Sequence, residues 1–236
     1  MKPLYDDRAD AGRHLAALLR GRRFVRPLVL GVPRGGVPVA REIALALNAE
    51  LDVLLVHKLS HPRNPELAIG AVGEGGVRWL AGSGGSGASG GSGGSGGVTP
   101  AEIERESARR AREIELRAAA YRTIRRPADA RGRDIILTDD GAATGATLRA
   151  GVMLLRARHA GLVVVAVPIA SVEAARALKE AADDFVCPRV TDDFSAVAEF
   201  YRDFTPTTDD QVERILRAAP SIVINPVVRP RPPSGV

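Results

Sequence analysis

Two adjacent carboxylates at the end of an apolar run are the side chains of this sequence best suited to chemistry. Asp139 and Asp140 directly follow the apolar residues 135–137 and Thr138. Two ionised carboxylates side by side are unfavourable unless cations or hydrogen-bond donors satisfy them. Sugar hydroxyl groups or a divalent metal ion would do so. We therefore predict that Asp139 and Asp140 bind a ligand that carries hydroxyl groups.

The loop after the acidic pair has the features of a phosphate site. Its small side chains leave backbone N–H groups open, and Thr144 and Thr147 add hydroxyl donors. A helix predicted over 144–157 would turn the positive end of its dipole toward the loop. The alternative is a strand–loop–helix crossover in which the acidic pair only caps the turn, but the whole pattern favours a ligand site. The predicted phosphate-binding residues are Gly141, Ala142, Ala143, Thr144, Gly145, Ala146 and Thr147.

A second glycine-rich segment, Pro33-Arg34-Gly35-Gly36, follows an earlier apolar run. The glycine pair would let backbone N–H groups approach an anion closely, and Arg34 adds positive charge. A tight strand-to-helix turn without any ligand would have the same composition. Taken alone, the segment leaves both interpretations open.

The polar segment 57–67 is predicted to be a loop because it contains two prolines. Lys58, directly after a predicted strand, is the favoured contact to an anion, followed by Arg63 and His61. A solvated loop without a ligand is the alternative. A zinc site at His57 and His61 is rejected, because no third ligand is apparent and the prolines break any helix.

The segment 192–204 contains four of the nine aromatic residues of the chain. An aromatic cluster after the last predicted strand could stack on a planar base or close the end of the core. We favour core closure for most of these side chains.

The elements that must position these residues alternate between strand and helix. The predicted strands are apolar without alternation, which is typical of a mainly parallel α/β sheet covered by helices on both faces. In such sheets, ligands bind at the carboxyl ends of the strands. The predicted strands are 27–30, 51–56, 68–72, 77–80, 134–137, 162–167 and 184–187, and the predicted helices are 6–19, 37–47, 99–121, 144–157, 172–182 and 209–218.

The segment 139–147 resembles the signature for phosphoribosyl pyrophosphate (PRPP) in type I phosphoribosyltransferases. The resemblance implies that Asp139 and Asp140 contact the 3′- and 2′-hydroxyls of the ribose. It also implies that residues 142–147 wrap the 5′-phosphate. The corresponding fold is a Rossmann-like, mainly parallel sheet flanked by helices, with a small hood and C-terminal appendage.

The same resemblance assigns the pyrophosphate group of PRPP to other segments. Pro33, Arg34, Gly35 and Gly36 would form its loop, with the Pro33–Arg34 peptide bond in the cis form. Lys58 and Arg63 would bring cations to it as the 57–67 loop closes.

The sequence is most similar to a bacterial branch of this family, over most of residues 1–218 except 82–97. The resemblance implies transfer of the phosphoribosyl group to a nitrogen nucleophile such as a nucleobase, through an oxocarbenium-like transition state, with Asp139, Asp140 and Lys58 as catalytic residues. Mg²⁺ is the implied cofactor, bound through PRPP with few direct protein ligands.

The acceptor of the phosphoribosyl group stays open in the sequence. Ala143 stands where the hypoxanthine and guanine enzymes of the family carry an aspartate, which disfavours those acceptors and leaves adenine- and orotate-type acceptors open. The main alternative function is a PRPP- or nucleotide-binding regulator without turnover. A hydrolase or phosphatase with Asp139 as nucleophile is disfavoured, because that class generally uses an Asp-x-Asp arrangement.

We expect a single domain over residues 1–218. Residues 82–97 contain only Gly, Ser and one Ala, and we expect a flexible linker or low-complexity loop there, either engineered or natural. The Pro-rich residues 219–236 are expected to form a disordered tail.

The composition is ordinary for a globular protein. Of 236 residues, 45% are hydrophobic and 26% charged, and no apolar run approaches the ~20 residues that a membrane helix needs. The one cysteine, Cys187, excludes an internal disulfide, and the start of the chain does not resemble a signal peptide. We therefore expect a cytoplasmic protein.

The net charge of +5 suits an anionic ligand. Nucleic acid is disfavoured as a partner, because the arginines are dispersed and no nucleic-acid-binding motif accompanies them. Members of the family are often dimers, so a homodimer is left open.

Overall fold

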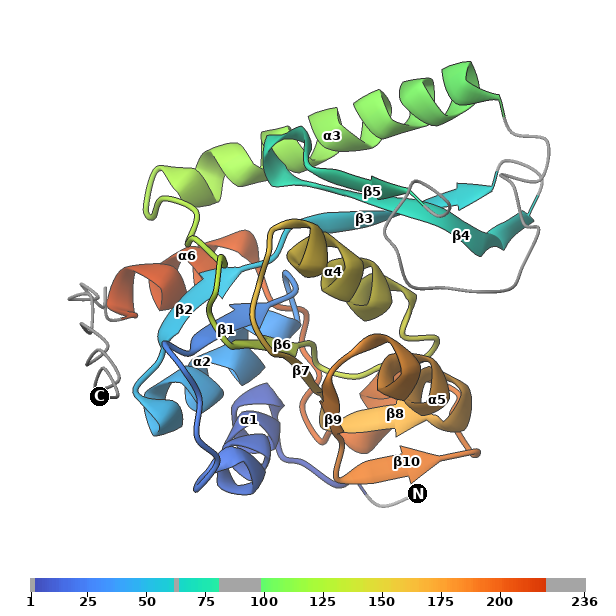
Figure 1. Cartoon of the computed structure of the whole chain (residues 1–236). Coiled ribbons are helices and arrows are strands. Elements are labelled where there is room, and N and C mark those ends of the chain that lie inside the picture. Colours follow the sequence, from blue (N-terminus) through green and yellow to red (C-terminus); the bar gives the residue numbers. More distant parts are fainter. Residues whose placement is uncertain (1–2, 62–63, 81–98, 220–236) are drawn as a thin grey trace, which may run out of the picture.

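Five parallel strands form the central sheet of the computed structural model, which describes residues 3–61, 64–80 and 99–219 (Figure 1). The order β2-β1-β6-β7-β9 confirms the predicted mainly parallel α/β sheet. Residues 62–63, 81–98 and 220–236, and with them Arg63, the Gly/Ser tract and nearly all of the predicted tail, lie outside the described residues. The strands are β1 (Leu28–Gly31), β2 (Glu50–Val53), β6 (Ile135–Thr138), β7 (Val163–Ala166) and β9 (Asp184–Val186).

Helices cover both faces of this sheet, which explains why its strands are apolar without alternation. One face packs against α1 and α2 through Val29, Ile136 and Val164 of the strands. The other packs against α4 and α5. The bounds of these helices are α1 (Arg8–Leu19), α2 (Gly36–Leu47), α4 (Ala146–Ala157) and α5 (Val172–Ala181).

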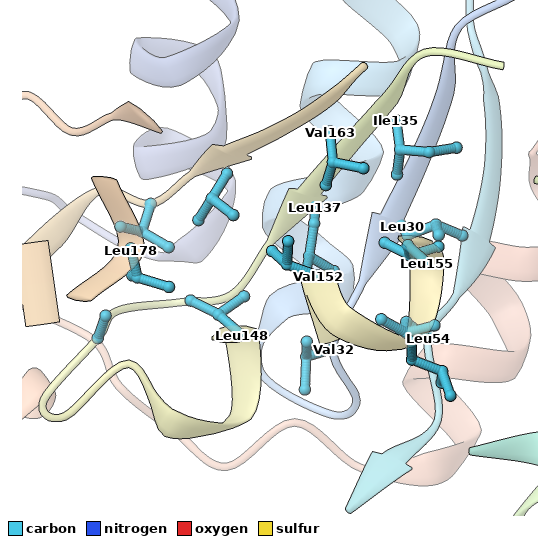
Figure 2. Close-up of a cluster of buried hydrophobic side chains, with 14 of the residues drawn as sticks. Leu30, Val32, Leu54, Ile135, Leu137, Leu148, Val152, Leu155, Val163 and Leu178 are labelled. Atoms are coloured by element: carbon cyan, nitrogen blue, oxygen red, sulfur yellow. The ribbon is translucent and has the colours of Figure 1, made fainter. Parts of the chain in front are cut away.

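The α4 face of the sheet holds the largest hydrophobic cluster. Figure 2 shows Leu137 and Val163 of the strands beside Val152 and Leu155 of α4. The helical spacing of these α4 side chains places them on one face of the helix, as the sequence predicts. This packing holds the start of α4 directly behind the loop that follows β6.

A second, smaller sheet lies over one end of the central sheet and corresponds to the expected hood (Figure 1). Its strands are antiparallel in the order β3-β4-β5, and Leu59, Val72 and Ile69 share a buried cluster with Ile114 and Tyr121 of α3. The elements of this part are β3 (Val56–His61), β4 (Asn64–Gly73), the 3-10 helix η1 (Glu74–Gly76), β5 (Arg78–Leu80), α3 (Pro100–Arg122) and α6 (Asp209–Ala218).

The prediction of a loop over 57–67 is wrong, because nearly all of β3 and the start of β4 occupy this segment. The polar residues and prolines of this segment predict a loop, but β3 and β4 pair through backbone hydrogen bonds, which do not depend on side-chain polarity. Pro65 is tolerated because it stands near the start of β4, before Gly70–Val72, where β4 pairs with β5. The predicted strand 51–56 likewise divides, since β2 ends at Val53 and β3 begins at Val56.

The C-terminal aromatic segment closes one end of the core, as the sequence analysis favours. Phe200 and Tyr201 are buried with Tyr5 in a separate cluster, and Phe194 and Phe204 pack against it. The sequence analysis misses three short elements around this cluster, β8 (Ile169–Ser171), β10 (Arg189–Thr191) and the 3-10 helix η2 (Val197–Phe200). None of the helices within the described ranges is both long and apolar enough to span a membrane.

Candidate functional site

The loops after β1 and β6 begin side by side at the carboxyl edge of the central sheet. The two strands are adjacent and in register, with Gly31 opposite Thr138. The N–H of Val32 donates to the carbonyl oxygen of Thr138 over 2.9 Å. The structure therefore brings together two of the three segments that the sequence analysis expects at this edge.

The glycine pair of the first loop packs directly on the acidic pair of the second. A Cβ atom at Gly35 would lie 2.0 Å from Asp140 Oδ2, and one at Gly36 would lie 2.8 Å from Asp139 Cα. No side chain fits at either position without displacing the carboxylates or their backbone. Glycine is needed at both positions because the two loops approach each other closely. This close packing joins the two loops into one continuous surface.

The Pro33–Arg34 peptide bond is cis, as expected from the resemblance. Beyond this bond, the Arg34 side chain reaches toward the first residue of α6, where its Nη1 lies 3.5 Å from Asp209 Oδ2. Tyr121 of α3 donates its hydroxyl to the same aspartate. The Arg34 side chain is half-exposed, and its ion pair with Asp209 links the loop to α6.

The acidic pair is electrostatically strained. Burial and the neighbouring charge of Asp140 raise the pKa of Asp139 well above its usual range. Burial also raises the pKa of Asp140, while the guanidinium group of Arg8 opposes this rise. Hydrogen-bond donors from a ligand would stabilise the ionised form of these two carboxylates.

Arg8, the first residue of α1, is a component of the site that the sequence analysis misses. Its Nε donates to Asp140 Oδ2 over 2.8 Å, and its guanidinium carbon lies 3.8 Å from the centre of the Phe204 ring. The hydroxyl of Tyr201 donates to the carbonyl oxygen of Asp140 over 2.6 Å. No local signal in the sequence points to these contacts, since they join the two ends of the described chain to its middle.

The segment 141–147 leaves the acidic pair along β8. The N–H of Ala142 donates to the carbonyl oxygen of Ile169 over 2.9 Å, and the Ser171 hydroxyl donates to the carbonyl oxygen of Ala143 over 2.6 Å. These contacts fix the outer side of the loop. Thr144 and Gly145 continue the loop, whereas Ala146 and Thr147 are the first residues of α4, and Thr144 and Thr147 are exposed.

The helix after this loop begins two residues later than predicted. It begins at Ala146 and not at Thr144, because Gly145 has a φ of +68°, a left-handed conformation that no helix continues. The N–H of Ala146 donates instead to Thr144 Oγ1 over 3.4 Å. The turn thus presents small residues immediately in front of the N-terminus of α4.

A pocket of about 650 Å³ adjoins this loop. The half-buried ring of Phe194 forms part of its wall and packs behind against Phe200, with ring centres 5.5 Å apart. Ala143 and Thr144 belong both to the loop and to the pocket wall. The pocket is lined by Ala143, Thr144, Ser171, Val172, Glu173, Arg176, Thr191, Asp192, Phe194 and Ser195.

The third predicted segment lies in the hood. Lys58 is in β3 opposite Ala71 of β4, so it occupies a strand and not a loop. Its contact with pyrophosphate stays a prediction, as does that of Arg63. His57 lies under α3, with Nε2 3.9 Å from Glu113 Oε2, and burial lowers its pKa.

The chain is similar to known proteins across all these segments. A sequence model of the phosphoribosyl transferase domain matches residues 3–205. Two curated relatives from Mycobacterium tuberculosis, strains CDC 1551 and H37Rv, are provisionally named phosphoribosyl transferases and are 42% identical over 216 residues. The match covers 92% of this chain and 47% of each relative, so the chain spans about half the length of these relatives.

A solved structure has the same fold over nearly its whole length. The crystal structure of TT1426 from Thermus thermophilus is 42% identical to this chain, with a TM-score of 0.79. The similarity covers 90% of this chain and 97% of that one.

Proposed function

We propose, because this chain belongs to the phosphoribosyl transferase domain family, that it transfers the phosphoribosyl group of PRPP to a nitrogen nucleophile and releases pyrophosphate. The close packing of Gly35 and Gly36 on Asp139 and Asp140 carries the proposal. A pyrophosphate loop at residues 33–36 and a ribose site at the acidic pair would then lie within the reach of one small molecule. Each residue role below is part of this proposal.

The proposed reaction requires that the protein orient PRPP and the acceptor and stabilise the charge of the leaving pyrophosphate. It requires no covalent nucleophile. The bond from the anomeric carbon to the pyrophosphate oxygen breaks, and its electron pair leaves with pyrophosphate. The acceptor nitrogen supplies the electron pair of the new bond and then loses its proton. Asp139 and Asp140 would hold the ribose hydroxyls, the N–H groups of 141–147 the 5′-phosphate, and residues 33–36 the leaving group.

The donor set of the site fits Mg²⁺ that enters with PRPP. Within the described ranges, no group of three or more potential metal-ligating side chains comes together. Mg²⁺ keeps several waters and binds substrate phosphates, so it needs few protein ligands. When bound, it would neutralise charge on the leaving pyrophosphate. Residues 33–36 and the acidic pair would hold it through PRPP.

The pocket beside Ala143 and Thr144 is the best candidate for the acceptor. It shares two residues with the proposed phosphate loop, and Phe194 offers a planar face for stacking. Ala143 supplies no carboxylate there, which favours adenine- or orotate-type acceptors over hypoxanthine and guanine. We expect Phe194→Leu to raise the KM for the acceptor while leaving the affinity for PRPP unchanged.

The proposal is tested by incubating the protein with PRPP, Mg²⁺ and a panel of nucleobases, and measuring pyrophosphate. We expect release with at least one base, and PRPP binding that Asp140→Ala weakens roughly 10- to 100-fold, because hydrogen bonds to charged groups contribute about 1.5–3 kcal/mol. Binding of PRPP without turnover on any base would favour a regulator. Unchanged binding by Asp140→Ala would overturn the ribose assignment.

A further inference from the structure

Arg8 and Asp140 form an ion pair at the centre of the proposed PRPP site. The Nε–Oδ2 distance is 2.8 Å, and the two side chains are only 11% and 16% exposed. Arg8 belongs to the first turn of α1, far from the acidic pair in sequence. The tertiary fold alone brings the two together.

The guanidinium group of Arg8 is held by two further contacts and lies close to Gly35. Its Nη1 donates to the carbonyl oxygen of Thr205 over 2.9 Å, and the Phe204 ring lies against its face. A Cβ atom at Gly35 would come within 3.3 Å of its Nε. These contacts leave the group little freedom to leave Asp140.

The same contacts fix the orientation of the Asp140 carboxylate. Its Oδ2 accepts from Arg8, and the N–H of Asp140 itself also donates to the carboxylate. The backbone of Asp140 is fixed separately, since its carbonyl oxygen accepts from the hydroxyl of the buried Tyr201. Both the carboxylate and the backbone of Asp140 are thus held by parts of the chain that lie far away in the sequence.

We propose that Arg8 is a positioning residue for PRPP, which holds the Asp140 carboxylate in the orientation that accepts a ribose hydroxyl. This inference rests on the proposed function. The alternative is that the ion pair serves folding alone. Buried ion pairs contribute little net stability compared with apolar packing, because desolvation offsets their attraction. A role in the site explains the pair better.

The test compares Arg8→Met and Arg8→Lys with the control Arg13→Met. Arg13 is on the same helix, is exposed and pairs only with Asp10 among the described residues. Isothermal titration with PRPP and Mg²⁺ gives the affinity, and thermal melting gives the stability. We expect Arg8→Met to weaken PRPP binding about 10- to 100-fold, as supporting residues typically do, Arg8→Lys to weaken it less, and Arg13→Met to leave it unchanged.

The pH dependence of binding supplies a readout that a purely structural role would not move. The charged and titratable groups that act on Asp140 include Arg8, Asp139 and Tyr201. The guanidinium group of Arg8 opposes the rise of the Asp140 pKa, so this pKa should be higher in Arg8→Met than in the wild type. As the pH is lowered, Arg8→Met should therefore lose PRPP binding at a higher pH than the wild type. If both proteins lose PRPP affinity at the same acidic pH, the inference is overturned.

The outcomes separate this inference from the proposed function. If the wild-type protein does not bind PRPP, both are overturned. If it binds PRPP and Arg8→Met binds equally well, only the role of Arg8 is overturned. If Arg8→Met does not fold, Arg8→Lys against Arg13→Lys decides: weaker binding supports the role, and equal binding overturns it.

Discussion

Asp139 lies at the end of a buried strand with a second carboxylate beside it. Burial is the larger cause of its raised pKa, and the charge of Asp140 adds to it. In water, an aspartate titrates near pH 3.9. The folded protein therefore holds a proton on Asp139 over a pH range in which the unfolded chain has already lost it.

This difference predicts a cost in stability that Asp139→Asn removes. The contribution of Asp139 to stability is fully present below its unfolded pKa and is lost as the pH rises through its raised folded pKa. Asp139→Asn should therefore melt at a higher temperature than wild type at pH 7 without ligand, and lose affinity for PRPP. Melting curves from pH 4 to pH 8 check this.

Asp140 stays in the variant and keeps part of the pH dependence, because its own pKa is also raised. Parallel pH slopes for Asp139→Asn and wild type would contradict the expectation. Asp134→Asn is a useful contrast, since Asp134 lies at the opposite end of β6 and accepts from the N–H of Val25. It should show no gain at pH 7.

At the scale of elements, the loop between β1 and α2 depends on Gly35. A methyl group there would overlap Asp140 Oδ2, so Gly35→Ala must separate the loop from the acidic pair. We expect a loss of about 1–3 kcal/mol of stability from overpacking, and PRPP affinity at least about tenfold lower, equivalent to ~1.4 kcal/mol. Calorimetric titration measures the affinity.

Gly21→Ala is the matched control. Gly21 has a φ of +83°, but an added methyl group would have nothing within 4 Å, and the residue lies outside the site. The variant should lose roughly 1 kcal/mol of stability from backbone strain and keep its PRPP affinity. Equal affinities for the two variants would show that the loop contact does not serve binding.

The outer side of the proposed phosphate loop depends on Ser171 at the start of α5. Its hydroxyl donates to the carbonyl oxygen of Ala143 over 2.6 Å and accepts from the N–H of Ala174 over 2.9 Å. We expect Ser171→Ala to lose about 1 kcal/mol of stability as an N-cap, and to weaken PRPP binding roughly 2- to 10-fold through the lost loop contact.

Thr99→Ala separates these two effects. Thr99 caps α3 in the hood, and its hydroxyl oxygen accepts from the N–H of Glu102 over 3.3 Å. It should lose similar stability in a chemical denaturation experiment, with unchanged PRPP affinity. If both variants bind PRPP alike, the Ser171–Ala143 contact has no role in the site.

At the scale of the whole molecule, a buried ion network fastens the hood to the central sheet. Arg122, the last residue of α3, binds Asp52 of β2 over 2.8 Å and Glu74 of η1 over 2.6 Å. The side chain of Asp52 is only 2% exposed. The same carboxylate accepts from the N–H groups of Val53 and Ala128, each over 2.8 Å.

Arg122→Met should destabilise the protein by roughly 3–5 kcal/mol, because it leaves a buried carboxylate unpaired. Arg217→Met, which breaks an exposed pair with Glu213, should change stability by less than about 1 kcal/mol. Denaturant unfolding curves measure both. A loss of the same size for the two variants would show that the network does not anchor the hood.

The parallel sheet, the order of its helices and the two candidate ligand loops could be predicted from local patterns in the sequence. Continuous apolar strands, the cap of α3 at Thr99 and the small residues of 139–147 are local patterns, and local backbone and burial preferences decide them. The family model matches residues 3–205, a range that includes these patterns. The positions of Lys58 and the missed strands could not be predicted, because short strands are defined by their pairing partners.

The surroundings of the acidic pair depend on long-range packing that the sequence patterns do not predict. Gly35, Arg8 and Tyr201 come from three separate parts of the chain, and each contacts Asp140 through packing that no local pattern encodes. The raised pKa of Asp139 likewise depends on burial, which follows from the assembled layers. Residue types and spacing in the sequence indicate which side chains could do chemistry. The distances between these side chains and their burial set their charge and orientation, and both arise from long-range packing.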